Sequence, residues 1–368
     1  MHCADTAASP ARRREGIAIL AEGERYDEII DVRSPAEFAE DHIPGAVNLP
    51  VLDNAERARV GTIYKQVSAF EAKKIGAALV SRNIARHLDD HFADKPRNYR
   101  PLVYCWRGGS RSGALATVLR SVGWSAGQLE GGYKAYRRAV VEDLAACPDK
   151  FRFVVVCGPT GVGKSRLLRT LSKAGGQVLD LEDLAAHKGS VLGADPNRPQ
   201  PAQKMFESLI RHRLKGFDPE RPVYVESESK KIGNLHTPEA LLARMRASAC
   251  VNLAADMPVR VALLVEEYAH FLAEPAVLFQ QLDCLTALQG QERIEHWKAL
   301  ARGGQWPELV AELLERHYDP AYNRSLGRNY VQAREAPTLR LASTRETAFR
   351  DLAQVLLQPD RSPDVGPA

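Results

Sequence analysis

Several features that define large classes of proteins are missing from this sequence of 368 residues. No apolar run approaches the roughly 20 residues that a membrane-spanning helix needs. The N-terminal segment, with its Arg12-Arg13-Arg14 run, lacks the apolar stretch of a secretory signal. The six cysteines form no C-x-x-C pair and show no metal-ligand spacing, which argues against a zinc site or a disulfide framework. We therefore expect a cytoplasmic protein that does not associate with a membrane and has no structural metal site.

The composition is that of a soluble globular protein, with 45% hydrophobic and 26% charged residues. The formal net charge of +4 is too small to indicate a nucleic-acid-binding protein. One local stretch is different, because residues 97–138 contain eight Lys or Arg against a single acid, Glu130. Such a surplus suits an anionic substrate or a phosphate backbone, although a solvated surface would have the same composition.

Short apolar runs alternate with helical stretches along most of the chain, which predicts an α/β protein with parallel sheets. The length suits two domains. We divide the chain into a disordered tail (1–14), a first domain (15–140), a linker (141–150), a second domain with a helical extension (151–345), and a helix end with a disordered tail (346–368). Strands are expected at 27–32, 101–105, 151–157, 177–181, 222–226 and 249–253, and helices at 111–122 and over much of 260–318.

A cysteine stands at the end of a predicted strand in the first domain. Cys105 closes the apolar run 102–105, a Gly-rich loop follows, and a helix is expected from Arg111. Backbone amides and a helix N-terminus aimed at the sulfur would lower its pKa and form an anion pocket, to which Arg107 and Arg111 add donors. We predict Cys105 as a thiolate nucleophile, the alternative being a buried structural thiol. The spacing of Cys105 and Arg111 also satisfies the C-x5-R pattern of protein phosphatases, so it leaves sulfur or selenium transfer and phosphate-ester hydrolysis both open.

A second motif, G-x4-G-K-S at 158–165, follows directly after the strand expected at 151–157. In this context it predicts a P-loop, whose amides wrap a phosphate chain while the lysine neutralises it and the serine can hold Mg²⁺. The predicted binding residues are Gly158, Thr160, Gly161, Gly163, Lys164 and Ser165. Asp180, Glu226 and Glu228 each end a predicted strand or follow one, and each is a candidate acidic partner. The motif does not distinguish ATP from a substrate with a diphosphate leaving group.

Several segments of the first domain resemble rhodanese domains in the order that the family shows. They are residues 29–38, residues 42–50, the Cys105 loop and residues 129–133. Within that resemblance, the region of Asp31 and Arg33 is expected to support the structure. The Cys105-Trp106-Arg107-Gly108-Gly109 loop and the order of the two domains also resemble bacterial tRNA 2-selenouridine synthases. So do the segments 180–182, 187–190, 226–229, 232–233 and 317–320.

That resemblance implies a transferase that acts on the wobble 2-thiouridine of Lys, Glu and Gln tRNAs. The family is described as placing a geranyl group from geranyl diphosphate on the sulfur, and then replacing the geranylated sulfur with selenium from selenophosphate. Cys105 would carry the selenium as an S-selanyl adduct. The tRNA would contact the basic stretch 97–138 or a second group, Arg316, Arg324 and Arg328, and Trp106 could stack on the base or pack in the core. A monomer is compatible with this scheme, although the sequence does not fix the oligomeric state.

Two other functions fit the same residues. The first is a rhodanese-type sulfurtransferase or a C-x5-R phosphatase with a separate ATP-binding module, which would turn over small substrates without tRNA. The second is a nucleotide-dependent RNA-binding protein with a vestigial rhodanese module. An intact Cys105 and an unbroken P-loop motif argue against the second.

Overall fold

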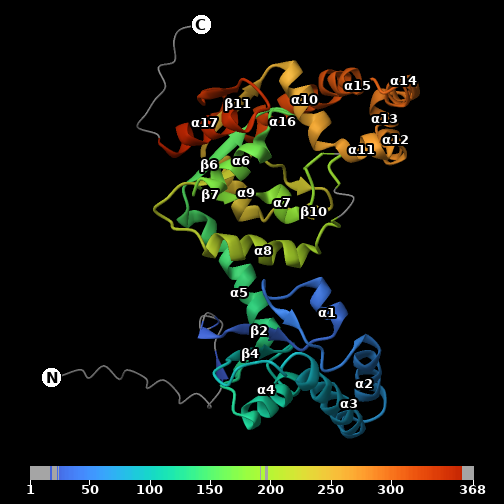
Figure 1. Ribbon diagram of the computed structural model, residues 1–368, viewed down its shortest axis with the longest axis vertical. Coiled ribbons are helices and arrows are strands. Elements are labelled where there is room, and N and C mark those ends of the chain that lie inside the picture. Colours follow the sequence, from blue (N-terminus) through green and yellow to red (C-terminus); the bar gives the residue numbers. More distant parts are fainter. Residues whose placement is uncertain (1–16, 19–22, 24, 191, 195–197, 359–368) are drawn as a thin grey trace, which may run out of the picture. The chain divides into compact units, whose positions relative to one another are not determined.

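The computed structural model describes residues 17–18, 23, 25–190, 192–194 and 198–358 (Figure 1). The chain divides into two compact units, Met1–Val141 and Glu142–Ala368. The expected linker at 141–150 is helical, since α5 (Gly132–Ala146) continues through it and a 3₁₀ turn, η2 (Cys147–Lys150), follows. The disordered tails expected at the two ends lie outside the described residues, apart from 346–358. There, α17 (Glu346–Leu357) is a full helix.

The first unit is built on a five-stranded parallel sheet in the order β1-β5-β4-β2-β3. The central strand β4 is buried at all four positions, as expected for a parallel strand covered by helices on both faces. Its core includes Ile30, Val103, Leu115 and Leu119. The strands are β1 (Ile17–Ala18), β2 (Glu28–Asp31), β3 (Val47–Asn48), β4 (Pro101–Tyr104) and β5 (Gly127–Leu129), and the helices besides α5 are α1 (Pro35–Glu40), α2 (Asn54–Gln66), α3 (Ala69–Asp90) and α4 (Ser110–Val122).

The second unit contains another five-stranded parallel sheet, in the order β12-β11-β6-β8-β7. Helices α6 and α17 pack on it, and their Leu167, Leu171 and Phe349 share a core with Val156 and Leu253. The strands are β6 (Phe153–Cys157), β7 (Gln177–Leu179), β8 (Val223–Glu226), β11 (Ala249–Ala255) and β12 (Thr338–Leu341), with a short antiparallel pair, β9 (Lys231–Ile232) and β10 (Leu235–His236). The helices beside them are α6 (Lys164–Lys173), α7 (Leu181–Ala185), α8 (Gln203–Lys215) and α9 (Glu239–Arg246).

The segment expected to be helical from 260 to 318 is a group of short helices, gathered at one edge of the second unit (Figure 1). They are α10 (Met257–Glu267), α11 (Ala269–Ala273), α12 (Pro275–Asp283), α13 (Thr286–Gln289), α14 (Gln291–Arg302), α15 (Trp306–Leu313), a π-helical turn η3 (Leu314–Tyr318) and α16 (Asp319–Asn329), followed by the 3₁₀ turn η4 (Val331–Arg334). These helices have a core of their own around Trp297, Leu282 and Leu309. Among the described residues, no helix is both long and apolar enough to span a bilayer.

Candidate active site

The Cys105 loop joins β4 to α4 and is held by the segment that follows β5. The N–H groups of Tyr133 and Lys134 donate to the carbonyls of Cys105 and Trp106, at 2.8 and 2.9 Å. Gly108 has a φ of +65°, and a Cβ there would lie 2.5 Å from a backbone oxygen, so this position requires glycine. These bonds hold the loop in the shape in which the N–H of Gly109 points toward the cysteine sulfur.

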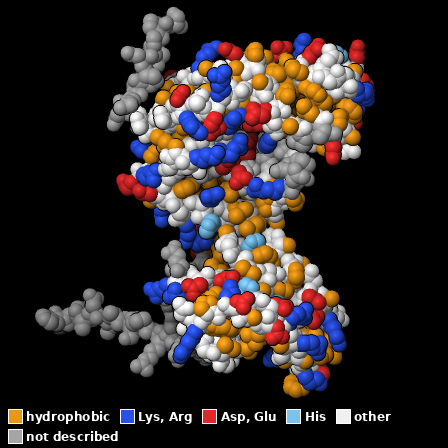
Figure 2. Space-filling model, viewed as in Figure 1, with side chains coloured by type: hydrophobic (Ala, Val, Ile, Leu, Met, Phe, Trp, Pro, Cys, Tyr) orange, Lys and Arg blue, Asp and Glu red, His pale blue; other side chains and the backbone are white. Residues whose placement is uncertain are grey.

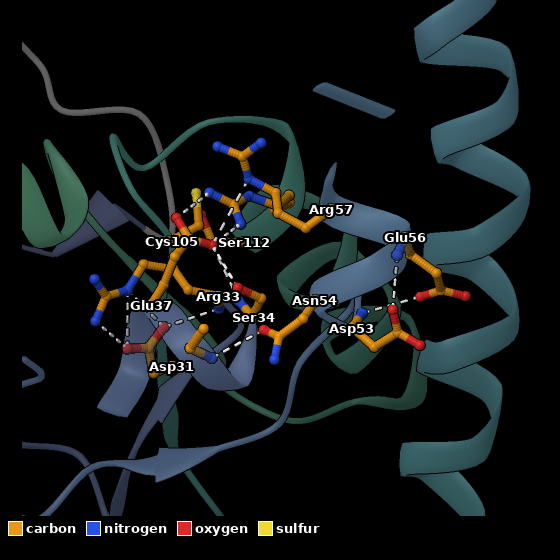
Figure 3. A network of polar contacts seen from close by, with 12 residues as sticks. Asp31, Arg33, Ser34, Glu37, Asp53, Asn54, Glu56, Arg57, Cys105 and Ser112 are labelled. Atoms are coloured by element: carbon orange, nitrogen blue, oxygen red, sulfur yellow. Dashed lines mark hydrogen bonds and ion pairs between the residues drawn. The ribbon is translucent and has the colours of Figure 1, made fainter. Parts of the chain in front are cut away.

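The thiol of Cys105 is 4% exposed and accepts two hydrogen bonds (Figure 3). The N–H of Gly109 lies 3.3 Å from the sulfur, and the hydroxyl of Ser112 lies 3.1 Å from it. Burial alone would raise the pKa of Cys105, but the hydrogen bonds from Ser112 and Gly109, together with the nearby charge of Arg111, outweigh it and lower the pKa. Ser112, which the sequence analysis did not single out, therefore belongs to the thiolate site.

The two arginines predicted for the anion pocket differ in what they contact. Arg111 is mostly buried and donates to both carboxylate oxygens of Glu37, at 2.8 and 3.4 Å. Arg107 is exposed. Arg111 would therefore have to share its guanidinium between Glu37 and an anion at the loop, whereas Arg107 is open to solvent.

Asp31 and Arg33 form a buried ion pair at the end of β2, in agreement with the structural role expected for them. The side chains are 0% and 1% exposed, and Arg33 Nη2 lies 2.6 Å from Asp31 Oδ2. Arg33 also donates to the carbonyl of Asp41 at 2.6 Å and lies over the ring of Tyr133, 3.9 Å from its centroid. The pair thus ties β2 to the residue that binds the Cys105 carbonyl.

In the second unit, the six residues predicted for phosphate binding lie in the loop after β6 and in the first turn of α6, which begins at Lys164. Lys164 Nζ donates to the carbonyl of Gly158 at 2.7 Å, and so points back over the loop. Ser165 Oγ donates to Glu182 Oε2 at 2.7 Å. Arg260 donates to the carbonyl of Thr160 at 2.8 and 3.0 Å, which fixes the tip of the loop. The arrangement presents a lysine, a serine and backbone amides to a phosphate chain.

The carboxylate beside Ser165 is Glu182, and not one of the three acids singled out from the sequence. Asp180 caps α7 by accepting from the N–H of Asp183 at 2.8 Å, and Glu226 accepts from the N–H of Glu182 at 2.9 Å. Glu182 and Glu228 converge below Gly189, where an added Cβ would lie 3.2 and 2.9 Å from their oxygens. Burial, and then the charge of Glu182, raise the pKa of Glu228 to about 8.

Asp180 also holds a proton more firmly than usual, since burial and then the nearby acids raise its pKa to about 6. Burial raises the pKa of Glu226 well above its ordinary value. The described residues contain no group of three or more His, Cys, Asp or Glu arranged to hold a metal ion. If a Mg²⁺ ion binds here together with a phosphate, Ser165 and Glu182 are the side chains that could hold it.

Two contacts from α16 support the phosphate loop, one directly and one through Arg260 of α10. The N–H of Gly158 donates to the hydroxyl of Tyr322 at 2.6 Å. Asp319 forms an ion pair with Arg260 at 2.6 Å. Asp319 lies in the segment 317–320 that carries part of the family resemblance, whereas nothing in the sequence marks Tyr322.

Fold and site together define a two-domain α/β protein, in which a rhodanese-like domain with a cysteine loop precedes a P-loop domain. Family models match both parts: a rhodanese-like domain over residues 17–139, and a domain described as the tRNA 2-selenouridine synthase AAA domain over residues 151–296. The chain belongs to the tRNA 2-selenouridine synthase family.

Relatives with that name match most of the chain. The protein from Alcanivorax borkumensis is 32% identical over 349 residues, which cover 86% of this chain and 92% of the relative. The protein from Sulfurovum sp. is 31% identical over 336 residues, covering 82% and 89%. For the protein from Nitrosomonas europaea, 36% identical over 244 residues, the match covers 65% of this chain and 63% of the relative, which is less than two thirds of its length.

Proposed function

We propose that this protein converts the wobble 2-thiouridine of tRNA to 2-selenouridine, by geranylation of the sulfur and then its replacement by selenium. The observation that carries the proposal is the Cys105 thiol, held as an ionisable nucleophile by Ser112 and Gly109 inside an anion-binding loop. Membership of a family named for 2-selenouridine synthesis supports the substrate. The second unit supplies the phosphate loop that a diphosphate donor requires.

The first step belongs to the phosphate loop. The tRNA sulfur attacks C1 of geranyl diphosphate, a carbon–sulfur bond forms, and the carbon–oxygen bond breaks as the diphosphate leaves with the electron pair. The uridine loses its N3 proton. Lys164 and the loop amides bind the leaving diphosphate. Mg²⁺ bound with the diphosphate would neutralise part of its charge, and Ser165 is the side chain placed to hold it. ATP has no role in this scheme.

The second step belongs to Cys105. Its thiolate attacks the selenium of selenophosphate, a sulfur–selenium bond forms, and the phosphorus–selenium bond breaks. The electron pair leaves with phosphorus, which departs as phosphite. The S-selanyl group then attacks C2 of the base and expels geranyl thiolate. A small-molecule thiol attacks the Cys105 sulfur, so that the sulfur–selenium bond breaks and the selenium stays on the base. Cys105 is left as a mixed disulfide, which a second thiol reduces to the free thiolate with release of a small-molecule disulfide. Arg107 and the loop amides hold the phosphoryl oxygens during the first attack.

Exposed basic side chains flank the cysteine loop and suit a tRNA backbone. Arg107 and Lys134 are exposed, and the backbone of Lys134 is bonded to that of Trp106. Trp106 is 39% exposed, so its ring is available to stack on an unstacked base. In the second unit, Arg316, Arg324 and Arg328 are exposed on η3 and α16. On the face shown in Figure 2, basic and acidic side chains are interspersed.

The test is to incubate the protein with 2-thiouridine-containing tRNA, geranyl diphosphate and selenophosphate, and to analyse the digested nucleosides by mass spectrometry. We expect a geranylated intermediate that converts to 2-selenouridine. Lys164→Ala should leave 2-thiouridine unreacted yet convert tRNA that is already geranylated, and Cys105→Ser should accumulate the geranylated nucleoside. Lys173→Ala, at the far end of α6, and Cys284→Ser, at an exposed cysteine, are the matched controls.

Two results would contradict the proposal. Unchanged 2-thiouridine with folded wild-type protein would favour the sulfurtransferase or phosphatase alternative. Equal loss of both steps in the two variants would overturn the assignment of the first step to the phosphate loop and of the second step to Cys105.

The phosphorus product, followed by ³¹P NMR, tests the chemistry at Cys105. Release of phosphate together with an active Cys105→Ser variant would assign the attack on the base to selenophosphate itself.

A further inference from the structure

An apolar cavity lies among the helices of the second unit, in a protein interior that is ordinarily closely packed. Its walls come from α10, α11, α12, α15 and the π-helical turn η3, and they include Leu264, Phe271, Leu309, Leu313 and Tyr318. It holds about 580 Å³ of empty space, counted to its open mouth. Part of that space is open to solvent, so the enclosed chamber is smaller.

The cavity is continuous with the phosphate loop. Thr160, at the tip of the loop, forms part of its wall. Gly161 is packed so closely against another wall residue, Leu264, that an added Cβ would lie 2.8 Å from the leucine Cδ1. A ligand whose phosphates lie in the loop would therefore have its remaining part at the entrance of an apolar chamber.

The shape of the cavity favours a thin and flexible occupant. The chamber is narrow, because water has access to only about 60 Å³ of it. The wall is almost entirely aliphatic and aromatic, with Tyr268 and Phe271 stacked at 5.6 Å between ring centroids. A nucleoside would bring a ribose and a base with several hydrogen-bonding groups that these walls could not satisfy. A hydrocarbon chain brings none.

One polar connection couples this chamber to the loop. Arg260 of α10 donates to the carbonyl of Thr160 and pairs with Asp319, the residue directly after η3. Leu314 and Tyr318 of η3 line the cavity. A π-helical turn inside an α-helical segment often marks a functional site. Here it joins the wall of the chamber to the residue that fixes the loop.

We propose that this cavity binds the prenyl chain of the diphosphate substrate, with the diphosphate in the loop formed by residues 158–165. The inference rests on the proposed function, which supplies an allylic diphosphate as donor. Burial of each methylene in the chamber contributes to affinity, so the cavity selects donors by chain length. The phosphate loop alone would bind short and long diphosphates equally.

The experiment compares the binding of inorganic diphosphate, dimethylallyl diphosphate and geranyl diphosphate to the full chain by isothermal titration calorimetry. With the wild type, we expect geranyl diphosphate to bind at least tenfold more tightly than either shorter compound. Val310→Trp places a large side chain in the cavity from a half-buried position on α15. It should weaken geranyl diphosphate at least tenfold and leave inorganic diphosphate unchanged, which also shows that the variant is folded. Leu288→Trp, at a position 74% exposed on α13, is the control and should behave as wild type.

Each outcome has one meaning. Equal affinities for the three compounds in the wild type, or a Val310→Trp variant that keeps the preference for the geranyl chain, would overturn the assignment of the cavity. If the preference for chain length is present and depends on Val310, but no geranylated nucleoside forms on tRNA, the cavity assignment stands and the proposed function fails. Lys164→Ala should weaken all three compounds to a similar extent, since it removes the charge that they share.

Discussion

The hydroxyl of Ser112, a residue in the first turn of α4, lies 3.1 Å from the sulfur of Cys105. Seven positions separate the two residues, and they meet because the loop after β4 turns the chain back over the end of the strand. A hydroxyl so placed donates more strongly to a thiolate than to a thiol, and it therefore favours ionisation. The reactivity of the nucleophile depends on a side chain outside the C-x5-R pattern.

Replacing Ser112 by alanine should raise the pKa of Cys105. A hydrogen bond to a charged group contributes about 1.5–3 kcal/mol, so removing it should disfavour the thiolate relative to the thiol. The rate of alkylation by iodoacetamide near pH 7 should fall about tenfold, measured as the pH profile of the Cys105 peptide by mass spectrometry. Ser121→Ala in the same helix is the control, and an unchanged midpoint in Ser112→Ala would contradict the prediction.

Arg33→Met should destabilise the first unit strongly. It would leave the Asp31 carboxylate buried without its partner, which costs about 3–5 kcal/mol in the free energy of unfolding. The exposed pair between Arg100 and Asp27 provides the control, because solvent screens its charges and Arg100→Met should cost far less stability. Urea unfolding followed by circular dichroism measures both. Similar losses in the two variants would show that burial does not govern the contribution of the Arg33 pair.

The parts of the molecule that could be predicted from sequence are those set by local pattern. The expected strands at 101–105, 151–157 and 222–226 match β4, β6 and β8 to within two residues at each end. The cysteine loop and the phosphate loop lie where their motifs place them, between a strand and a helix. Apolar runs bounded by glycines carry this information within about ten residues, so no distant contact is needed to find them.

Contacts between distant residues could not be predicted in the same way. Glu37 binds Arg111 across 74 positions, and Tyr322 accepts from Gly158 across 164 positions. The acid beside Ser165 depends on a helix cap, since Asp180 turns to the N–H of Asp183 and so leaves Glu182 to face the serine. Local sequence pattern does not mark Glu37 or Tyr322, and only the fold decides which of these pairs forms.

The stability of the second unit should depend on pH through Glu228. Its pKa is about 8 in the folded protein against an ordinary value of 4.5, so the folded state retains a proton that the unfolded state releases. Stability should therefore fall as the pH rises from about 4.5 to about 8. Glu228→Gln should remove part of this dependence, on the order of a few kcal/mol in the free energy of unfolding. The difference in Tm between pH 5.5 and pH 8 should therefore become smaller by roughly several degrees.

Differential scanning calorimetry at the two pH values provides the measurement. Glu308→Gln, at an exposed glutamate on α15, is the control and should keep the dependence of the wild type. A Glu228→Gln variant that loses as much stability as the wild type between pH 5.5 and pH 8 would show that another buried group, such as Glu226, retains the proton instead.

The affinity for tRNA should depend on salt through the basic residues beside the cysteine loop. Each lysine or arginine that neutralises a phosphate releases counterions on binding, which contributes about 0.7–0.9 to the slope of log affinity against log salt concentration. Arg107→Ala and Lys134→Ala should each reduce that slope by nearly this amount, and should weaken different tRNAs by the same factor. Fluorescence anisotropy at salt concentrations between about 50 and 200 mM, which bracket physiological ionic strength, measures the slope.

Arg82→Ala, at an exposed position on α3 outside the basic stretch, is the control. If the slope falls only in Arg324→Ala, the backbone contacts belong to the second unit, and a slope unchanged in all of these variants would exclude both basic groups as the tRNA surface.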